Sequence, residues 1–150
     1  MPAERTLPTT ADTEEFGRML AGELAAGDLV VLDGPLGAGK TALTRGIAAG
    51  LGVVGRVSSP TFIIARQHRA GPHDGAVALV HVDAYRLGGG DHLLDDLDAL
   101  DLDTELEHAV VVVEWGAGVV EHLAERHLLV ALRREPESEV RTVTWEWKTS

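Results

Sequence analysis

The eight residues GPLGAGKT, at positions 34–41, restrict the fold of this chain more than any other segment. They match the pattern G-x-x-x-x-G-K-[ST], between an apolar run typical of a buried strand and a segment with helical spacing. There, Gly34, Gly37 and Gly39 would let the backbone wrap around a phosphate, with N–H groups pointing inward and a helix dipole behind them. A chance glycine-rich turn is the alternative, and the position between strand and helix argues against it. The motif therefore predicts a phosphate-binding loop.

Lys40 and Thr41 supply the polar chemistry that such a loop needs. The Lys40 ammonium would reach the β- and γ-phosphates as a mobile charge, and the Thr41 hydroxyl would bind magnesium. A guanine site usually carries an N-K-x-D loop after a late strand, and the sequence contains none. ATP and Mg²⁺ are therefore the expected cofactors.

Length and composition predict one compact domain spanning residues 1–150. The chain is 45% hydrophobic, which suffices for a core, and it has no cysteine, which excludes disulfides and thiolate chemistry. The absence of a membrane-length apolar run and of a signal-peptide stretch predicts a cytoplasmic protein with no membrane association. The net charge of −11 opposes independent binding to nucleic acid, so a role on RNA would require a partner.

The hydrophobic pattern predicts alternating helices and strands, followed by hairpins. A first helix is expected over residues 9–28, capped by Thr10 or Asp12, and a second over 39–52. Strands are expected at 29–33, from about 62, and at 76–83, 109–114, 127–134 and 139–148, with further helical segments at 88–108 and 116–125. Helix-linked strands mixed with hairpins predict an α/β P-loop NTPase fold of three layers, with a partly parallel mixed sheet flanked by helices.

Two of the expected strands end in an acid, and a P-loop enzyme needs an acid to hold its magnesium. ALVHVD ends at Asp83 and AVVVVE ends at Glu114. The alternative for each is a solvated residue that marks a strand end, but with a phosphate loop in the same domain at least one of them is expected to hold the metal. His81 would share a strand face with Asp83 and line the site, although a structural histidine is the commoner case. In SSPTF, Thr61 would face the γ-phosphate, unless this is an ordinary entry into a strand.

Four segments, GPLGAGKT, SSPTF, HVDAYRL and VVVVEWG, in this order and spacing, resemble the TsaE (YjeE) family. These are small bacterial P-loop ATPases of the tRNA threonylcarbamoyladenosine pathway, and the resemblance covers nearly the whole chain. It implies that the loop from Gly34 to Thr41, including Ala38, binds the ATP phosphates. Thr41 and Glu114 would then ligate magnesium, and Asp83 would be the acid needed for hydrolysis.

The resemblance extends to residues outside these roles. Trp115 is similar to a functionally sensitive tryptophan of the family, and the segment that contains Thr10 resembles the part that approaches the adenine. Arg141 resembles a C-terminal arginine near the nucleotide. The family also implies TsaB and TsaD as partners, a complex reset by ATP hydrolysis, tRNA reached only through that complex, and a monomer when alone.

The sequence departs from the family pattern at a few apolar or loop positions. Pro35 stands where the family usually has an acid, and Val82 and Ala84 replace larger apolar residues of HFDLYRL. These changes concern loop rigidity and packing, because they remove no polar group that the mechanism uses.

Two other functions remain open alternatives on sequence alone. In a small-molecule kinase, Asp83 would be the acceptor base and Arg86 a phosphate clamp, but 150 residues without an arginine-rich lid leave little room for an acceptor site. A nucleotide-gated binding module with little turnover would have the same motifs.

Trp145 and Trp147 alternate on one expected strand, which favours core or partner packing over base stacking.

Overall fold

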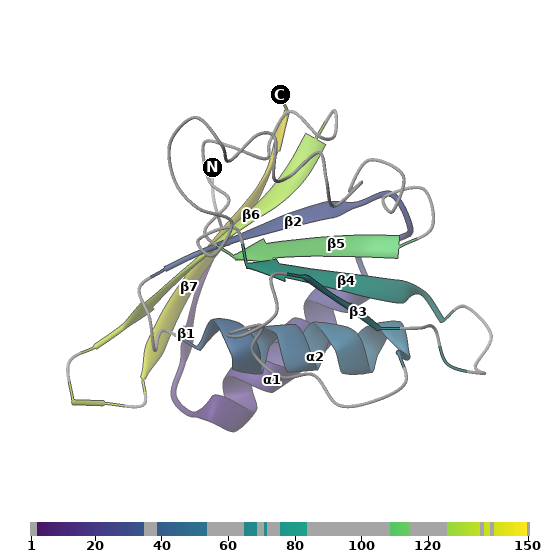
Figure 1. The fold of residues 1–150 in the computed structure, drawn as a ribbon. Coiled ribbons are helices and arrows are strands. Elements are labelled where there is room, and N and C mark those ends of the chain that lie inside the picture. Colours follow the sequence, from purple (N-terminus) through teal and green to yellow (C-terminus); the bar gives the residue numbers. More distant parts are fainter. Residues whose placement is uncertain are drawn as a thin grey trace.

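The computed structural model describes residues 3–34, 39–53, 65–68, 71, 76–83, 109–114, 126–135, 137, 138 and 140–149. The described strands form one seven-stranded sheet in the order β1-β7-β6-β2-β5-β4-β3 (Figure 1). Their bounds are β1 Ala3–Leu7, β2 Leu29–Asp33, β3 Ala65–His68, β4 Ala78–Asp83, β5 Ala109–Glu114, β6 Arg126–Arg134 and β7 Arg141–Thr149.

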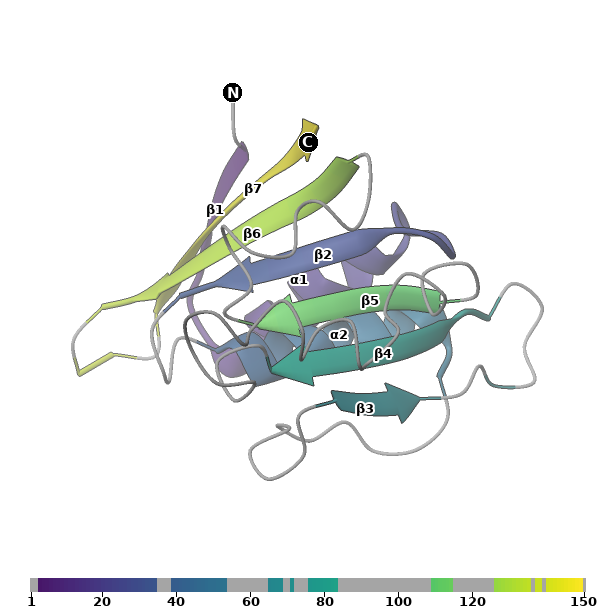
Figure 2. The same ribbon diagram turned by 45° about the horizontal axis from the view of Figure 1, so that its top comes forward.

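The sheet is parallel at its centre and antiparallel at both sides. Strand β2 pairs in parallel with β5 and with β6, and β4 pairs in parallel with β5. Strand β3 runs against β4, as Figure 2 shows, and β7 runs against both β6 and β1. The predicted mixed, partly parallel sheet is confirmed, including both hairpin pairs.

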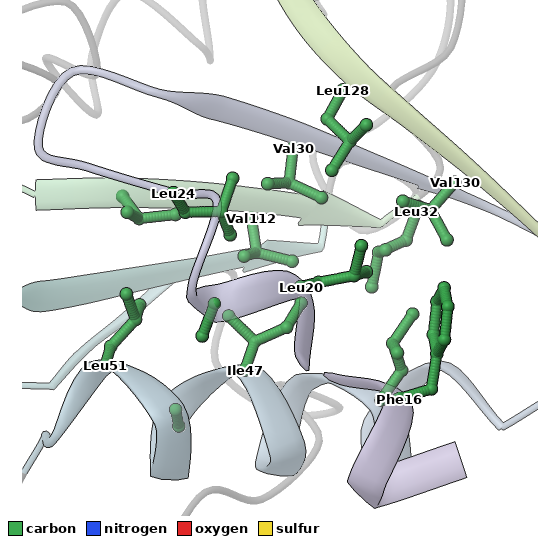
Figure 3. Close-up of a cluster of buried hydrophobic side chains, with 14 of the residues drawn as sticks. Phe16, Leu20, Leu24, Val30, Leu32, Ile47, Leu51, Val112, Leu128 and Val130 are labelled. Atoms are coloured by element: carbon green, nitrogen blue, oxygen red, sulfur yellow. The ribbon is translucent and has the colours of Figure 1, made fainter. Parts of the chain in front are cut away.

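Two helices, α1 (Thr10–Ala21) and α2 (Lys40–Leu51), lie together on one face of this sheet (Figure 1). Leu20 and Ile47 project from them toward Val30 and Val112 of the sheet, as Figure 3 shows, and all four side chains are fully buried. Every residue of β5 is buried, so the central strands are covered on both faces, as is typical of parallel strands. The segments expected to be helical at 88–108 and 116–125 lie outside the described residues.

Three glycines allow α1 and α2 to approach with their backbones nearly in contact. A Cβ atom added to Gly46 would overlap the Glu14 carbonyl group, and one added to Gly17 would overlap the Leu43 carbonyl oxygen. A Cβ on Gly50 would lie 2.8 Å from the Arg18 carbonyl oxygen. The position of α1 is therefore set by α2, the helix that follows the predicted phosphate loop.

The N-cap of α1 lies one residue before Thr10 and three before Asp12, the two predicted caps. Thr9 is the N-cap, because its hydroxyl accepts from the Asp12 N–H at 3.2 Å. The Asp12 carboxylate accepts in turn from the Thr9 N–H at 3.0 Å. This reciprocal arrangement is a capping box, which satisfies two backbone donors at the helix start.

The prediction that this helix continues to residue 28 was wrong, since α1 ends at Ala21. The Gly22 N–H donates to the Met19 carbonyl at 3.1 Å and closes the last turn. Leu24 is buried beyond the end of the helix, where its apolar side chain still falls at helical spacing from Leu20. Because Leu24 is buried at this spacing, the apolar pattern in the sequence extends past the residue where the helix ends.

Strand β1 was not predicted. Four of its five residues are exposed and only Leu7 is buried, so the segment lacks the alternation that indicates a half-buried strand. It forms by pairing antiparallel with β7 at the edge of the sheet. Charged residues such as Glu4 and Arg5 are common on edge strands, where they discourage pairing with other chains.

The tryptophans of β7 are partly buried and pack against the core, which is one of the two kinds of packing that the sequence favours over base stacking. The ring of Trp145 meets Phe16 of α1 edge to face, with centroids 4.7 Å apart and planes at 66°. Trp147 is also partly buried against the core. Within the described ranges, neither helix is long and apolar enough to cross a membrane.

Candidate functional site

The two ends of the predicted phosphate loop are held by β2 and α2. Gly34 follows the last residue of β2, and Gly39 precedes Lys40, the first residue of α2. Gly39 has φ +103°, a left-handed conformation that side-chain-bearing residues rarely adopt. The strand–loop–helix setting predicted from the motif is confirmed, whereas Gly37 and Ala38 lie outside the described residues.

Lys40 bends back over the entrance of this loop. Its ammonium Nζ donates to the Gly34 carbonyl oxygen at 2.6 Å, and the residue is only 5% exposed. In P-loop NTPases the lysine of this motif contacts the β- and γ-phosphates. The structure therefore brings Lys40 and Gly34 together, and the predicted contact of Lys40 with the β- and γ-phosphates stays a prediction.

The first turn of α2 presents a hydroxyl and backbone donors next to the loop. Thr41 is half-buried there, and the Thr44 hydroxyl donates to the Lys40 carbonyl at 2.9 Å, which braces the turn. Gly39 at the N-cap has no side chain to satisfy the N–H groups of the first turn. Such a helix start is suited to binding an anion.

The two candidate acids end neighbouring parallel strands. Asp83 of β4 pairs in register with Glu114 of β5, and Glu114 pairs with Leu32 of β2, one residue before that strand ends. Residues paired in a parallel ladder lie on the same face of the sheet, and these strands end at the same edge. Both acidic residues therefore lie at the edge where the phosphate loop begins. The prediction that these strands deliver their acids to the loop is confirmed for the backbone. The Asp83 side chain lies outside what is described.

Glu114 has a buried hydrogen-bond partner, His81. The imidazole Nε2 lies 2.5 Å from the Glu114 carboxylate Oε2, and the two side chains are 0% and 7% exposed. His81 is therefore a buried histidine in contact with one of the two candidate acids, and whether it lines the nucleotide site stays a prediction. Its contact with Glu114 was missed, since it depends on the register of β4 against β5, which the sequence does not contain.

Arg141 and Thr13 reach the loop from two other elements. A Cβ atom on Gly39 would lie 3.2 Å from the Arg141 Nε and 3.8 Å from the Thr13 methyl group. Both residues are buried, at 8% and 1% exposure, although they belong to β7 and α1. Thr10 lies one turn before Thr13 on the same side of α1. Arg141 thus lies beside Gly39, and its predicted place near the nucleotide stays a prediction.

Two further predicted residues, Thr61 and Trp115, lie outside the described residues, so their placement stays a prediction. A groove of 340 Å³ runs between β1 and α1, lined by residues from Arg5 to Met19. It contains none of the residues expected to bind phosphate or metal, so the motif, and not the groove, identifies the site.

A comparison of the sequence with protein families identifies the lineage of this site. The family model described as threonylcarbamoyl adenosine biosynthesis protein TsaE matches residues 7–143. The chain belongs to the TsaE family. The resemblance inferred from the four motifs is therefore confirmed over nearly the whole chain.

Curated TsaE proteins of several bacteria are similar in sequence. Each carries the name tRNA threonylcarbamoyladenosine biosynthesis protein TsaE. The Mycobacterium tuberculosis protein is 54% identical over 149 residues, which is 97% of this chain and 87% of the relative. The Streptomyces coelicolor protein is 55% identical over 136 residues, covering 87% and 86%. The Bacillus subtilis protein is 34% identical over 129 residues, covering 85% and 75%.

The fold also matches a solved structure. The crystal structure of Bacillus subtilis YdiB superimposes with a TM-score of 0.73 and 26% sequence identity, over 100% of this chain and 87% of YdiB. The α/β fold with a mixed sheet predicted from the sequence is therefore confirmed by a known structure as well as by the strand pairing.

Proposed function

We propose that this chain binds and hydrolyses ATP with magnesium, and that hydrolysis resets the TsaB–TsaD complex of tRNA threonylcarbamoyladenosine synthesis. One observation carries the proposal. Lys40 folds over Gly34 at the end of β2, and the buried Glu114 carboxylate ends the neighbouring strand. A phosphate-binding loop next to a strand-end acid is the arrangement that P-loop ATPases use. Family membership adds the pathway.

Phosphate binding is assigned to the loop from Gly34 to Thr41. The Lys40 ammonium would exchange the Gly34 carbonyl for phosphate oxygens, which are stronger acceptors because they are charged. The backbone N–H groups in the first turn of α2 would add donors along the helix axis. Arg141, packed on Gly39, would add a second positive charge, and Thr10 belongs to the segment proposed to approach the adenine.

The residues present suit magnesium. Thr41 offers a hydroxyl and Glu114 a carboxylate, which are the hard oxygen donors that Mg²⁺ prefers. The described residues contain no cluster of three or more histidine or acidic side chains able to hold a metal alone. This fits a P-loop site, where most ligands are waters and substrate phosphates. When bound, magnesium would offset the negative charge between the β- and γ-phosphates.

Hydrolysis is assigned to Asp83. Its position beside Glu114 in the β4–β5 ladder places an acid at the loop edge in addition to the one proposed as metal ligand. The Asp83 carboxylate would accept a hydrogen bond from the attacking water and orient it toward the γ-phosphate. Thr61 is proposed to contribute on the γ-phosphate side, and Trp115 beside Glu114.

The partners proposed are TsaB and TsaD, with the chain a cytoplasmic monomer when alone. The net charge of −11 favours contact with proteins over direct contact with tRNA, because tRNA phosphates would be repelled. The tRNA would then be reached only through the complex.

The test is ATP hydrolysis by the purified chain, measured with and without the TsaB–TsaD pair. The proposal predicts magnesium-dependent phosphate release that rises when the pair is added. Absence of hydrolysis in the presence of the pair would contradict it and favour a binding module with little turnover. Transfer of the γ-phosphate to an added small molecule would instead favour a kinase.

A further inference from the structure

His81 is a fully buried imidazole on β4. Strand β5 lies between β4 and β2, the strand that leads into the phosphate loop. His81 is 0% exposed, and its neighbours along the same face of the sheet, Leu79 and Val112, are apolar and fully buried. A polar ring in such surroundings costs free energy unless it is hydrogen-bonded. Its bond to Glu114 is therefore the feature that explains a histidine at this position.

The direction of this hydrogen bond follows from the chemistry of the two groups. An ionised carboxylate only accepts, so the His81 Nε2 must carry the proton and donate to Glu114 Oε2. The other ring nitrogen, Nδ1, is buried without a hydrogen-bond partner in the described part of the chain. Among the described residues, a ring proton on Nε2 has an acceptor, whereas one on Nδ1 would have none.

The same bond fixes one oxygen of Glu114 and leaves the other available. Among the described contacts, Glu114 makes a single hydrogen bond, through Oε2 to His81. Its side chain is 7% exposed, and within the described ranges His81 is the partner that orients the carboxylate. Without the imidazole, the side chain would be free to turn to other rotamers at the end of β5.

We propose that His81 is a positioning residue, which holds the Glu114 carboxylate in the rotamer that binds the magnesium of the nucleotide complex. The inference rests on the proposed function, because it assumes that Glu114 is the metal ligand. Hydrogen-bonded partners of metal-ligating groups commonly change metal affinity about 10- to 100-fold when they are removed. His81 would do this without touching the nucleotide or the metal.

A merely structural role makes a different prediction. If His81 only satisfied a buried carboxylate, its loss would lower the stability of the fold and weaken nucleotide binding equally with and without magnesium. A positioning role affects only the part of the affinity that magnesium adds. The ratio of the two affinities therefore separates the roles.

The experiment measures the dissociation constant of a fluorescent ADP analogue in excess Mg²⁺ and in EDTA, for the intact wild-type chain and its variants. His81→Leu is expected to lower the magnesium-dependent gain in affinity by about 10-fold or more, with the EDTA value unchanged. His81→Gln keeps an amide donor near the position of Nε2 and should retain most of the gain. Leu79→Val, two residues earlier on the same buried face, is the matched control and should behave like wild type.

His81→Asn keeps the test decisive if the leucine variant does not fold, and a double variant adds a check if it does. His81→Asn is polar, but its amide is too short to reach Oε2, so it should lose the gain that His81→Gln retains. In the Glu114→Gln background, His81→Leu should have no further effect, since the group it positions has already been changed.

Each outcome has one meaning. An unchanged magnesium gain in His81→Leu, or equal losses with and without the metal, would overturn the positioning role and leave the proposed function standing. Wild-type protein whose affinity does not depend on magnesium would overturn both.

Discussion

At the scale of single residues, Glu114 is the most informative position in the site. It is a buried carboxylate at the end of β5, next to the start of the phosphate loop in the β2–β5 ladder, and a buried imidazole holds it. A charge in such a place needs a partner or a ligand, because burial alone disfavours it. His81 satisfies one oxygen, and the proposed metal would engage the carboxylate from the other side.

Replacing this carboxylate tests whether Glu114 holds the metal while Asp83 supports hydrolysis. Glu114→Gln should lower nucleotide affinity in Mg²⁺ by about 10-fold or more, because a neutral amide binds the metal poorly. Affinity in EDTA should stay near that of wild type. Titration with a fluorescent nucleotide checks this, and an unchanged dependence on magnesium would make Asp83 the metal ligand instead.

Asp83 is expected to act on turnover and not on binding. Asp83→Ala should retain nucleotide affinity but lower the rate of ATP hydrolysis by about 100-fold or more, as is common when a positioned acid or base is removed. Phosphate release and nucleotide titration on the same sample check both halves of the prediction. Loss of nucleotide binding itself would contradict the catalytic assignment.

At the scale of elements, the site depends on how closely α1 packs against α2. Glycines at the crossing bring the helix backbones almost into contact, and this places Thr13 of α1 against Gly39 at the start of α2. The capping box at Thr9 fixes where α1 begins, and thus where its first turn lies relative to the loop. The element that forms one wall of the site is therefore positioned by packing and capping together.

Substitution at this crossing gives a prediction opposite in sign to helix propensity. Alanine favours helix over glycine by roughly 1 kcal/mol, so Gly46→Ala would stabilise an isolated helix. In this fold the new methyl group would overlap the Glu14 carbonyl, and overpacking typically costs about 1–3 kcal/mol. A net loss in the free energy of unfolding is expected, measured by urea denaturation.

The exposed face of the same helix provides the control for Gly46→Ala. Ala49→Gly carries only the propensity cost of roughly 1 kcal/mol, because Ala49 is exposed. A more stable Gly46→Ala protein would show that the two helices separate readily and that their close contact is not required.

At the scale of the whole molecule, the position of the site follows from a sheet that is parallel at its centre and antiparallel at both sides. Ligands of such sheets bind at the carboxyl ends of the parallel strands, and β2, β4 and β5 end together at the phosphate loop. This much was predictable from the sequence, because continuous apolar runs ending in an acid or a glycine-rich loop mark buried parallel strands. The bounds of β2 agree with the sequence prediction for the same reason.

Other features depend on distant parts of the chain meeting, and the sequence alone does not specify them. Strand β1 exists because β7 offers it an edge, and its own residues lack an alternating pattern. The His81–Glu114 contact depends on the register between two strands 33 residues apart. The approach of Arg141 to Gly39 was expected only from the family resemblance, since no local pattern links β7 to the loop.

ATP hydrolysis by Lys40→Ala in the presence of the TsaB–TsaD pair tests the central claim most directly. Lys148→Ala is the matched control, because Lys148 is half-exposed on β7 and its ion pair with Glu146 is at the surface, where such pairs contribute little. We predict that Lys40→Ala loses magnesium-dependent phosphate release while Lys148→Ala keeps the wild-type rate. Undiminished hydrolysis by Lys40→Ala would contradict the assignment of residues 34–41 as the ATP site.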